Sequence, residues 1–393
     1  MKKALRKIHL WLSVPTGIII TLVCFSGAML VFEKEITEAI KPELYFVKEA
    51  KGEPIPMQQL MEKVEETLPD SVSISGVTVF ADSTRTYQVS LSKPRRASIY
   101  VNQYTGEVTG RSERLPFFNT MFHLHRWLLG SSTGVGKLLT GICTLVLVFI
   151  LITGILMWLT NRNKPLKASL AIHVTKGWGR FWHDLHVAGG IYTTIFLLAM
   201  ALTGLTWSFS WYRTGFYACF GVESSEKGGA HGEGGNSHGE GRGSRGEGRY
   251  SHGDGRNNHE GKRGEGRGFH RRSPYRHWED VLNEVALKNP GYQQITLKPE
   301  VAEVVPEGRL SMRAADKYSY DRRSGEITDV QLYSAGKKDT KVRSGVYMVH
   351  TGSWGGIITR ILNFLAAFIG ATLPLTGYWL WFRRKRAAIA HHH

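Results

Sequence analysis

The 393-residue chain has few cysteines and fewer acidic than basic residues. Its three cysteines, Cys24, Cys143 and Cys219, form no CxxC motif, which excludes a disulfide framework. The 33 Asp and Glu face 50 Lys and Arg, for a formal net charge of +17. As an average, this composition is typical of a soluble basic protein, including nucleic-acid binders. The positions of the charges exclude that class, because large parts of the chain carry none.

Four stretches lack Asp, Glu, Lys and Arg altogether: Leu10–Phe32, Leu138–Asn161, Val187–Tyr212 and Ile361–Phe382. As helices, each spans roughly 33 Å or more, enough to cross a bilayer core of about 30 Å. The first stretch lacks an A-x-A-like cleavage site and is long for a signal peptide, so we expect a retained helix. The sequence therefore predicts a protein with four transmembrane helices, in contact with the lipid bilayer.

The basic residues indicate the orientation of these helices. They gather in three short segments without acidic residues: 2–7, 162–180 and 383–386. With four helices of alternating direction these segments share one side, which the positive-inside rule makes cytoplasmic. The N- and C-termini are then cytoplasmic, and segments 33–122 and 213–345 lie outside. Since the outer segments are close to neutral, we expect no nucleic-acid partner.

The chain also contains an internal duplication. His9 and Ser26-Gly27 recur 177 residues later as His186 and Thr203-Gly204, and Thr153-Gly154 recurs 223 residues later as Thr376-Gly377. Asn102–Gly106 recurs as Asp321–Gly325. Both halves enter the membrane in the same direction, which predicts parallel repeats about an axis along the membrane normal.

These patterns predict an integral membrane α-helical bundle of two parallel duplicated halves, with two small extracytoplasmic α+β domains. Helices are expected at 56–68 and 278–288, strands at 86–91 and 97–101, and hairpin turns at Gly106 and Gly325. We place the segments as follows: helix 1, 1–32; outer domain 1, 33–122; helix 2, 123–161; cytoplasmic loop, 162–182; helix 3, 183–212; connector, 213–227; Gly/His-rich disordered insert, 228–272; outer domain 2, 273–345; helix 4, 346–382; cytoplasmic tail, 383–393, with 391–393 a possible tag remnant.

Histidines stand at the N-terminal end of every predicted spanning segment: His9; His123 and His125; His183 and His186; His350. Alternating helix direction places His9, His183 and His186 at the cytoplasmic level and the others at the outer level. Each level thus offers histidines from two helices, as ligation of a haem iron between helices requires. The alternatives are a proton relay, another metal site, or simple interfacial residues.

Within the doublets we favour His186, which the repeat aligns with His9, and His125; His183 and His123 are the alternates. Eighteen residues are five helical turns, so His9 and Gly27 share one face about 27 Å apart, as do His186 and Gly204. We expect Gly27, Gly154, Gly204 and Gly377 to leave space for a flat haem.

The motifs around these residues resemble bacterial PepSY-associated transmembrane proteins over nearly the whole chain apart from the insert. They are Lys7-Ile-His9…Ser26-Gly27, Phe122-His-Leu-His125-Arg-Trp, Trp182-His-Asp-Leu-His186…Thr203-Gly204 and Met348-Val-His350-Thr-Gly…Thr376-Gly377. The resemblance implies PepSY-like outer domains and a dihaem b-type protein of the inner membrane. Some members are ferric-siderophore reductases of iron uptake. Ser26 departs from the usual Thr of the first Thr-Gly.

The leading hypothesis is therefore a membrane-bound haem-dependent oxidoreductase with two haem b, whose iron is ligated by His9 and His186 and by His125 and His350. It would pass electrons from a separate donor, either a quinol or a soluble flavoprotein, to a periplasmic acceptor such as a ferric siderophore. No catalytic residue is identified. The rival hypothesis is a haem-free binding or regulatory protein, with its outer domains anchored by the helices.

Other patterns leave alternatives open. The outer aromatics Phe117, Phe118, Trp127, Trp211 and Trp354 fit either an interfacial belt or a docking surface. Histidines in the insert fit either a solvated linker or weak metal capture. The G-x-G-x-x-G match at 241–246 follows no strand, so it does not predict a dinucleotide site.

Overall fold

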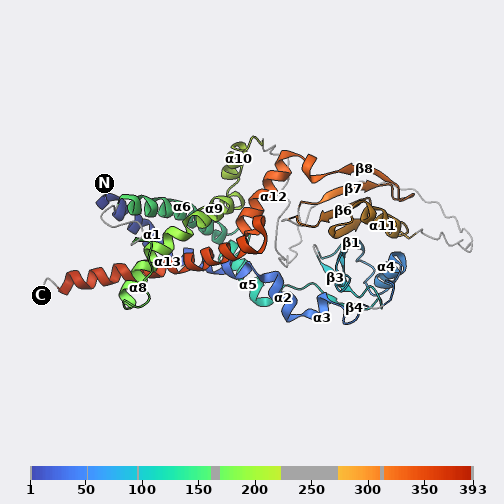
Figure 1. The fold of residues 1–393 in the computed structure, drawn as a ribbon, viewed down its shortest axis with the longest axis horizontal. Coiled ribbons are helices and arrows are strands. Elements are labelled where there is room, and N and C mark those ends of the chain that lie inside the picture. The colour runs from blue at the N-terminus through green and yellow to red at the C-terminus, as the bar shows by residue number, and fades with distance from the viewer. Residues whose placement is uncertain are drawn as a thin grey trace, which may run out of the picture.

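The computed structural model of the chain describes residues 2–50, 52–94, 97–160, 169–222, 273–309 and 314–390. The insert 228–272, with its histidines and its glycine-rich match, and residues 391–393 lie outside that part. A helical bundle forms one end of the elongated molecule and a β-sheet layer forms the other (Figure 1). Both chain ends lie at the far end of the bundle from the sheet, as the predicted topology requires.

The four apolar runs all form helices long enough to cross a membrane, which confirms that prediction. The first two are α1 (Lys2–Leu30) and α6 (Val135–Thr160). The third is α8 (Trp178–Asp184), a π-helical turn η1 (Leu185–Gly189) and α9 (Gly190–Ser208) in one line, and the fourth is α13 (Gly356–Ala390). Helix α1 packs against α13 and α6, and α9 packs against the same two helices, so the four enclose a common core.

The segments predicted as single helices at 123–161 and 346–382 are each divided in two. His125 lies on the short helix α5 (Pro116–Trp127), and His350 lies on α12 (Lys338–Thr351). Leu128 and Leu129 take left-handed φ angles of 48° and 67° after α5, and Gly352 takes 74° after α12. A left-handed residue ends the helical hydrogen-bond ladder, so each outer histidine precedes its spanning helix on a separate helix.

The two outer segments form one antiparallel sheet rather than two separate ones, in the order β4-β3-β2-β1-β5-β6-β7-β8. Each half contributes four consecutive strands. The strands are β1 (Ile74–Phe80), β2 (Tyr87–Leu91), β3 (Ser98–Val101), β4 (Val108–Arg111), β5 (Tyr292–Lys298), β6 (Val301–Pro306), β7 (Asp316–Tyr320) and β8 (Ile327–Gln331). The expected hairpin turns are confirmed, with Gly106 and Gly325 at φ angles of 77° and 78°.

Short helices accompany the sheet and its connections. The predicted helices at 56–68 and 278–288 are confirmed as α4 (Met57–Glu66) and α11 (Trp278–Lys288). The others are α2 (Glu33–Ile40), α3 (Pro42–Tyr45), α10 (Ser210–Ala218) and the 3-10 turns η2 (Tyr333–Ala335) and η3 (Ser353–Gly355).

Strands β1 and β5 meet at the centre of the sheet and correspond to each other in the duplication. Thr78 lies directly opposite Thr296, and their hydroxyl oxygens are 2.9 Å apart. When equivalent residues of two repeats contact each other, the contact must lie on the axis that relates the repeats. The pseudo-two-fold axis therefore passes through the middle of the sheet.

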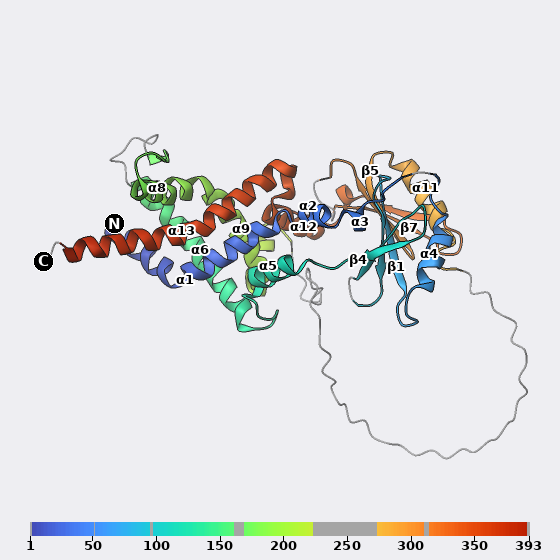
Figure 2. The same ribbon diagram turned by 90° about the horizontal axis from the view of Figure 1, so that it is seen from below.

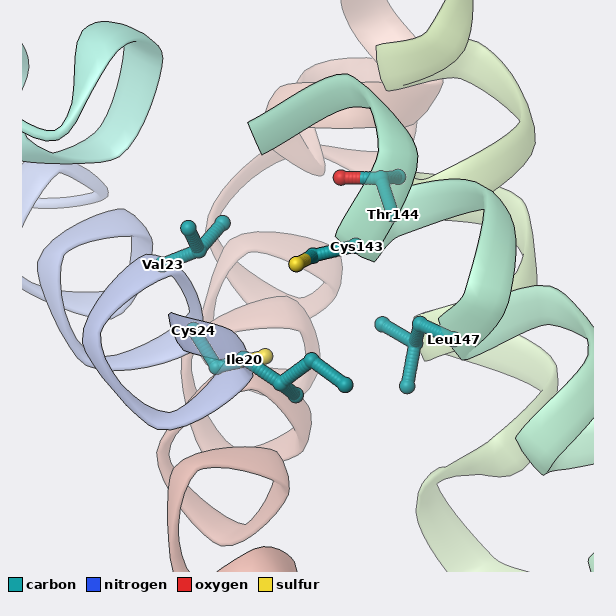
Figure 3. Close-up of a pocket in the computed structure, with 6 residues that line it drawn as sticks. All are labelled: Ile20, Val23, Cys24, Cys143, Thr144 and Leu147. Carbon is teal, nitrogen blue, oxygen red and sulfur yellow. The ribbon is translucent and has the colours of Figure 1, made fainter. Parts of the chain in front are cut away.

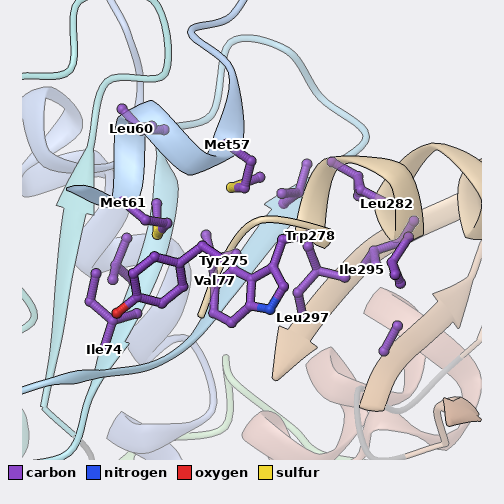
Figure 4. Close-up of a cluster of buried hydrophobic side chains, with 14 of the residues drawn as sticks. Met57, Leu60, Met61, Ile74, Val77, Tyr275, Trp278, Leu282, Ile295 and Leu297 are labelled. Atoms are coloured by element: carbon purple, nitrogen blue, oxygen red, sulfur yellow. The ribbon is translucent and has the colours of Figure 1, made fainter. Parts of the chain in front are cut away.

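One hydrophobic core joins both halves of the sheet layer. Helices α4 and α11 cover the face of the sheet that points away from the bundle (Figure 2). Met57, Leu60 and Met61 of α4 meet Trp278 of α11 over the strands, all at most 1% exposed (Figure 4). Since the core draws on both halves, neither outer segment buries its apolar residues alone.

Leu297 lies near the end of β5 and is fully buried, so replacing it tests how much this core stabilises the sheet layer. We expect Leu297→Ala to cost about 2–5 kcal/mol, because it removes buried methyl groups and leaves a cavity. Thermal unfolding of the full chain in detergent should show a lower Tm. The matched control Leu287→Ala, at a side chain 83% exposed on α11, should change stability by about 0.5 kcal/mol or less. Equal shifts in both variants would show that the shared core does not stabilise the sheet layer.

Three arginine–glutamate pairs connect the sheet layer to the bundle through α2. Glu33 binds Arg114 just before α5, and Glu38 binds Arg85 beside β2. Glu35 binds Arg360 near the start of α13, which holds the pKa of that carboxyl below its usual value. Since Glu35 and Arg360 belong to different halves, this pair also ties the halves together at the outer end of the bundle.

Candidate functional site

Two pairs of histidines face each other across the interface between the halves. His9 on α1 and His186 on η1 have ring centroids 6.5 Å apart, with the ring planes at 89°. His125 on α5 and His350 on α12 have ring centroids 6.0 Å apart, with the planes at 54°. Each pair joins equivalent residues of the two repeats, so both pairs lie on the same axis as Thr78 and Thr296. The structure therefore brings the four favoured histidines together in two pairs, His9 with His186 and His125 with His350.

Each of these imidazoles is anchored through Nδ1 to a spanning helix of its own half. His9 contacts the hydroxyl of Thr153 at 3.0 Å, and His125 contacts the carbonyl oxygen of Val23 at 2.9 Å. His186 contacts the carbonyl of Leu373 at 3.1 Å and the hydroxyl of Thr376 at 3.0 Å. His350 makes the corresponding contacts, to the carbonyl of Met200 at 3.0 Å and to the hydroxyl of Thr203 at 3.2 Å. With Nδ1 engaged in this way, Nε2 is the nitrogen left to bind a metal.

The glycines of the Thr-Gly and Ser-Gly motifs contact the same imidazoles. A Cβ atom at Gly27 would stand 2.8 Å from Cε1 of His125, and one at Gly204 would stand 3.1 Å from Cε1 of His350. The distances at Gly377 and Gly154 are 3.3 Å to His186 and 3.7 Å to His9. Each motif thus forms a seat for a histidine: the glycine lies against Cε1 of the ring, and a carbonyl or hydroxyl of the same helix contacts Nδ1. Contact between these glycines and a haem stays a prediction.

The geometry of the pairs fits a metal ion held between two imidazoles. A metal–imidazole bond is about 2 Å long, and the ring centre lies about 1.1 Å beyond the nitrogen. Two opposed imidazoles on one ion therefore have centroids about 6.2 Å apart, close to the 6.5 Å and 6.0 Å observed. The described residues contain no group of three or more His, Cys, Asp or Glu arranged for a metal. Two protein ligands suit haem, whose macrocycle supplies the other four, better than zinc, which takes three or four from the protein.

The alternate histidines lie elsewhere. His123 packs its ring against Trp127 at 5.0 Å between centroids, and His183 contacts the carboxylate of Asp184 at 3.2 Å. Neither forms a ring pair with another histidine in the described ranges. That His125 and His186, rather than His123 and His183, are the ligands remains a prediction, which alanine variants of these histidines test.

Two features near His186 are not visible in the sequence pattern. His186 lies in the π-helical turn η1, a geometry frequent at functional sites. Just before it, the carboxylate of Asp184, 4% exposed, binds His173, Arg180 and His183. These bonds fix the start of the third spanning segment, and therefore the position of η1.

Buried polar side chains hold the turn that follows His350. The amide of Asn363, 2% exposed, donates to the carbonyls of Val349 and His350 at 3.2 Å and 3.3 Å. One turn earlier on α13, Thr359 binds the backbone of Gly352 and Gly355. The sequence pattern did not point to either residue, although an amide within an apolar run is itself unusual.

Asn363→Asp should loosen the outer histidine pair, because it places an oxygen against two carbonyl oxygens at a buried position. If the pairs hold haem, we expect part of the outer haem to be lost during purification while the other haem is retained. Reduced-minus-oxidised spectra per mole of protein measure this. A full complement of haem in the variant would show that Asn363 does not position His350.

The aromatic residues considered for an interfacial belt or a docking surface differ in how exposed they are. Phe118 and Trp127 are 2% and 6% exposed, so they form neither a lipid belt nor a docking surface. Phe117, Trp211 and Trp354 are about half exposed or more and remain compatible with both. Cys24 and Cys143 are free thiols beside a cavity of about 10 Å³ between α1 and α6, room for about one water (Figure 3).

Comparison with known proteins gives one family match that covers most of the chain. The family model described as PepSY-associated TM region matches residues 6–384. The search of curated proteins finds no match. The match includes both histidine pairs, all four seats and the sheet layer.

Proposed function

The chain belongs to the PepSY-associated TM region family, and on this premise we propose that it is a dihaem b-type electron-transfer protein. In this proposal one haem lies between His9 and His186 and a second between His125 and His350. The observation that carries the proposal is the repeated geometry of the pairs. In each, two imidazoles from different halves stand at the separation of axial ligands, with Nδ1 bonded to a helix.

The residues of the chain have three tasks in this function. The imidazoles hold the iron, and the carbonyls and hydroxyls at Nδ1 fix the tautomer and make Nε2 a stronger ligand. The surrounding helices exclude water, which together with the axial ligands sets the redox potential. When bound, each haem supplies a one-electron iron couple. Helix α1 places the two levels about 27 Å apart along its axis, from His9 to Gly27, so in this proposal one haem would lie near each face of the roughly 30 Å hydrocarbon core.

The direction of electron flow in this proposal follows from the charges at the two ends. The end of the bundle that carries the chain termini bears Arg383, Arg384, Lys385 and Arg386, and the positive-inside rule assigns it to the cytoplasm. The bundle then spans a bacterial inner membrane, and the sheet layer lies on its periplasmic side, next to His125 and His350. We propose that electrons enter at His9 and His186 and leave at the outer pair.

The proposed acceptor is a ferric siderophore, by the family resemblance. Ferrous iron binds hard oxygen ligands less tightly than ferric iron, so one-electron reduction would release the metal. For this reaction, His125 and His350 must hold a haem, and the ferric siderophore must be able to approach that haem.

The test uses the purified full chain, reduced with dithionite under anaerobic conditions and then freed of excess reductant. Mixing with a ferric trihydroxamate should reoxidise the b-type spectrum, with ferrous iron appearing in a ferrozine assay. His350→Ala should slow this reoxidation strongly, because it removes a ligand of the outer haem, whereas His123→Ala should not. Protein that stays reduced with every ferric chelate tried would contradict the reductase function. A colourless protein from haem-replete cells would favour the haem-free binding protein.

A further inference from the structure

A second site lies at the terminal end of the bundle, outside the histidine pairs. A cavity of about 330 Å³ opens there between α8 and α13. Gly179, Arg180 and His183 line it from α8, and Leu380 and Arg383 line it from α13. Two guanidinium groups and an imidazole thus converge on one open cavity.

The nitrogen atoms in this cavity are arranged as donors. The buried carboxylate of Asp184 accepts from Nε of Arg180 at 2.8 Å and from Nδ1 of His183 at 3.2 Å. This leaves the terminal nitrogens of Arg180 as donors for a ligand. Arg383 stacks over the ring of Trp379, 5.3 Å from its centroid, and pairs with no carboxylate in the described part of the chain. Two guanidinium groups without a lining carboxylate match a phosphate oxyanion.

Gly179 gives the Arg383 guanidinium its place in the cavity. Nη1 of Arg383 lies where a Cβ atom of residue 179 would stand, so any larger side chain displaces it.

The location identifies the source of the phosphate. The lining residues belong to the first turns of one candidate span, Trp178–Ser208, and the last turns of another, Ser353–Arg386. Trp178 beside them is 75% exposed and stacks on Trp182, as expected of aromatics at a membrane–water interface. Basic pockets between helices at this level bind anionic lipid headgroups. We propose that this cavity binds the headgroup phosphate of an anionic phospholipid.

The test compares lipid binding by four forms of the full chain in neutral detergent, read by native mass spectrometry with added phosphatidylglycerol or phosphatidylcholine. Arg383→Gln removes a donor, and Gly179→Leu fills the cavity while keeping every charge. The matched control is Lys385→Gln, which loses the same charge from a side chain stacked on Trp381 outside the cavity. We expect wild type and the control to bind phosphatidylglycerol, and the two cavity variants to bind it about tenfold more weakly.

Three results would contradict the proposal. Equal weakening in Arg383→Gln and Lys385→Gln would mean that diffuse positive charge attracts the lipid. If the protein bound added inorganic phosphate but did not bind phosphatidylglycerol, the cavity would be a site for free phosphate. A changed haem spectrum in Arg383→Gln with unchanged lipid binding would assign the donors to haem carboxylates. The readout is lipid, so failure here leaves the proposed electron transfer intact. Size-exclusion profiles identify variants that fail to fold, and either cavity variant alone suffices.

Discussion

If the chain binds two haems as proposed, His186→Ala is expected to remove about half of the reduced b-type absorbance of the purified protein, because it would take one ligand from one of them. The matched control His183→Ala should keep the full absorbance, since His183 binds Asp184 rather than a second histidine. Dithionite-reduced spectra per mole of protein measure both. Loss of haem in the control but not in His186→Ala would move the ligand to the other member of the doublet.

The pairing across the halves makes a sharper prediction for double variants. In the proposed function His9 and His186, whose rings face each other, serve the same haem, so the double variant should lose no more absorbance than either single variant. His186→Ala combined with His350→Ala should lose nearly all of it, because these residues belong to different pairs. Additive losses for His9 and His186 would contradict the pairing.

If His125 and His350 hold a haem as proposed, Gly27→Ala is expected to disturb that haem severely, although it adds only one methyl group. That carbon would stand 2.8 Å from Cε1 and 3.0 Å from Nδ1 of His125, closer than real Cβ contacts allow. The imidazole must move from its seat on α1 and lose its bond to Val23. We expect the absorbance of the outer haem, about half the total, to fall or its spectrum to change.

The matched control for Gly27 is Gly154→Ala on α6. Its added carbon would lie 3.7 Å from Cε1 of His9, an ordinary van der Waals contact, so both haems should be retained. Gly377 and Gly204, at 3.3 Å and 3.1 Å, should show graded effects between these two. If all four alanine variants behaved alike, the glycines would not act by seating the histidines.

Much of the bundle was predictable because its determinants are local in the sequence. The absence of charge over four long runs predicts four spanning helices, and the amphipathic pattern at 278–288 matches α11 at both ends. The duplication predicted that histidines of two helices share each level. Once the halves are related by a two-fold axis, equivalent residues near that axis must meet, as His9 and His186 do.

What was not predictable depends on contacts between distant segments. The joining of the two outer segments into one sheet arises from pairing of β1 with β5, which no local pattern encodes. The glycines after His125 indicate irregular backbone there, but not that the break between α5 and α6 falls at left-handed Leu128 and Leu129, residues that favour helix by propensity. The role of the glycines under the imidazoles required the packing of neighbouring helices, since spacing along one helix gives only the shared face.

The most direct test of the central claim is the haem content of the purified full chain by the pyridine haemochrome method. Two bis-histidine sites predict two haem b per 393-residue chain, and low-spin ferric signals in the oxidised protein. A chain purified from haem-replete cells with no haem, or with one haem that survives every single replacement of His9, His125, His186 and His350, would contradict it.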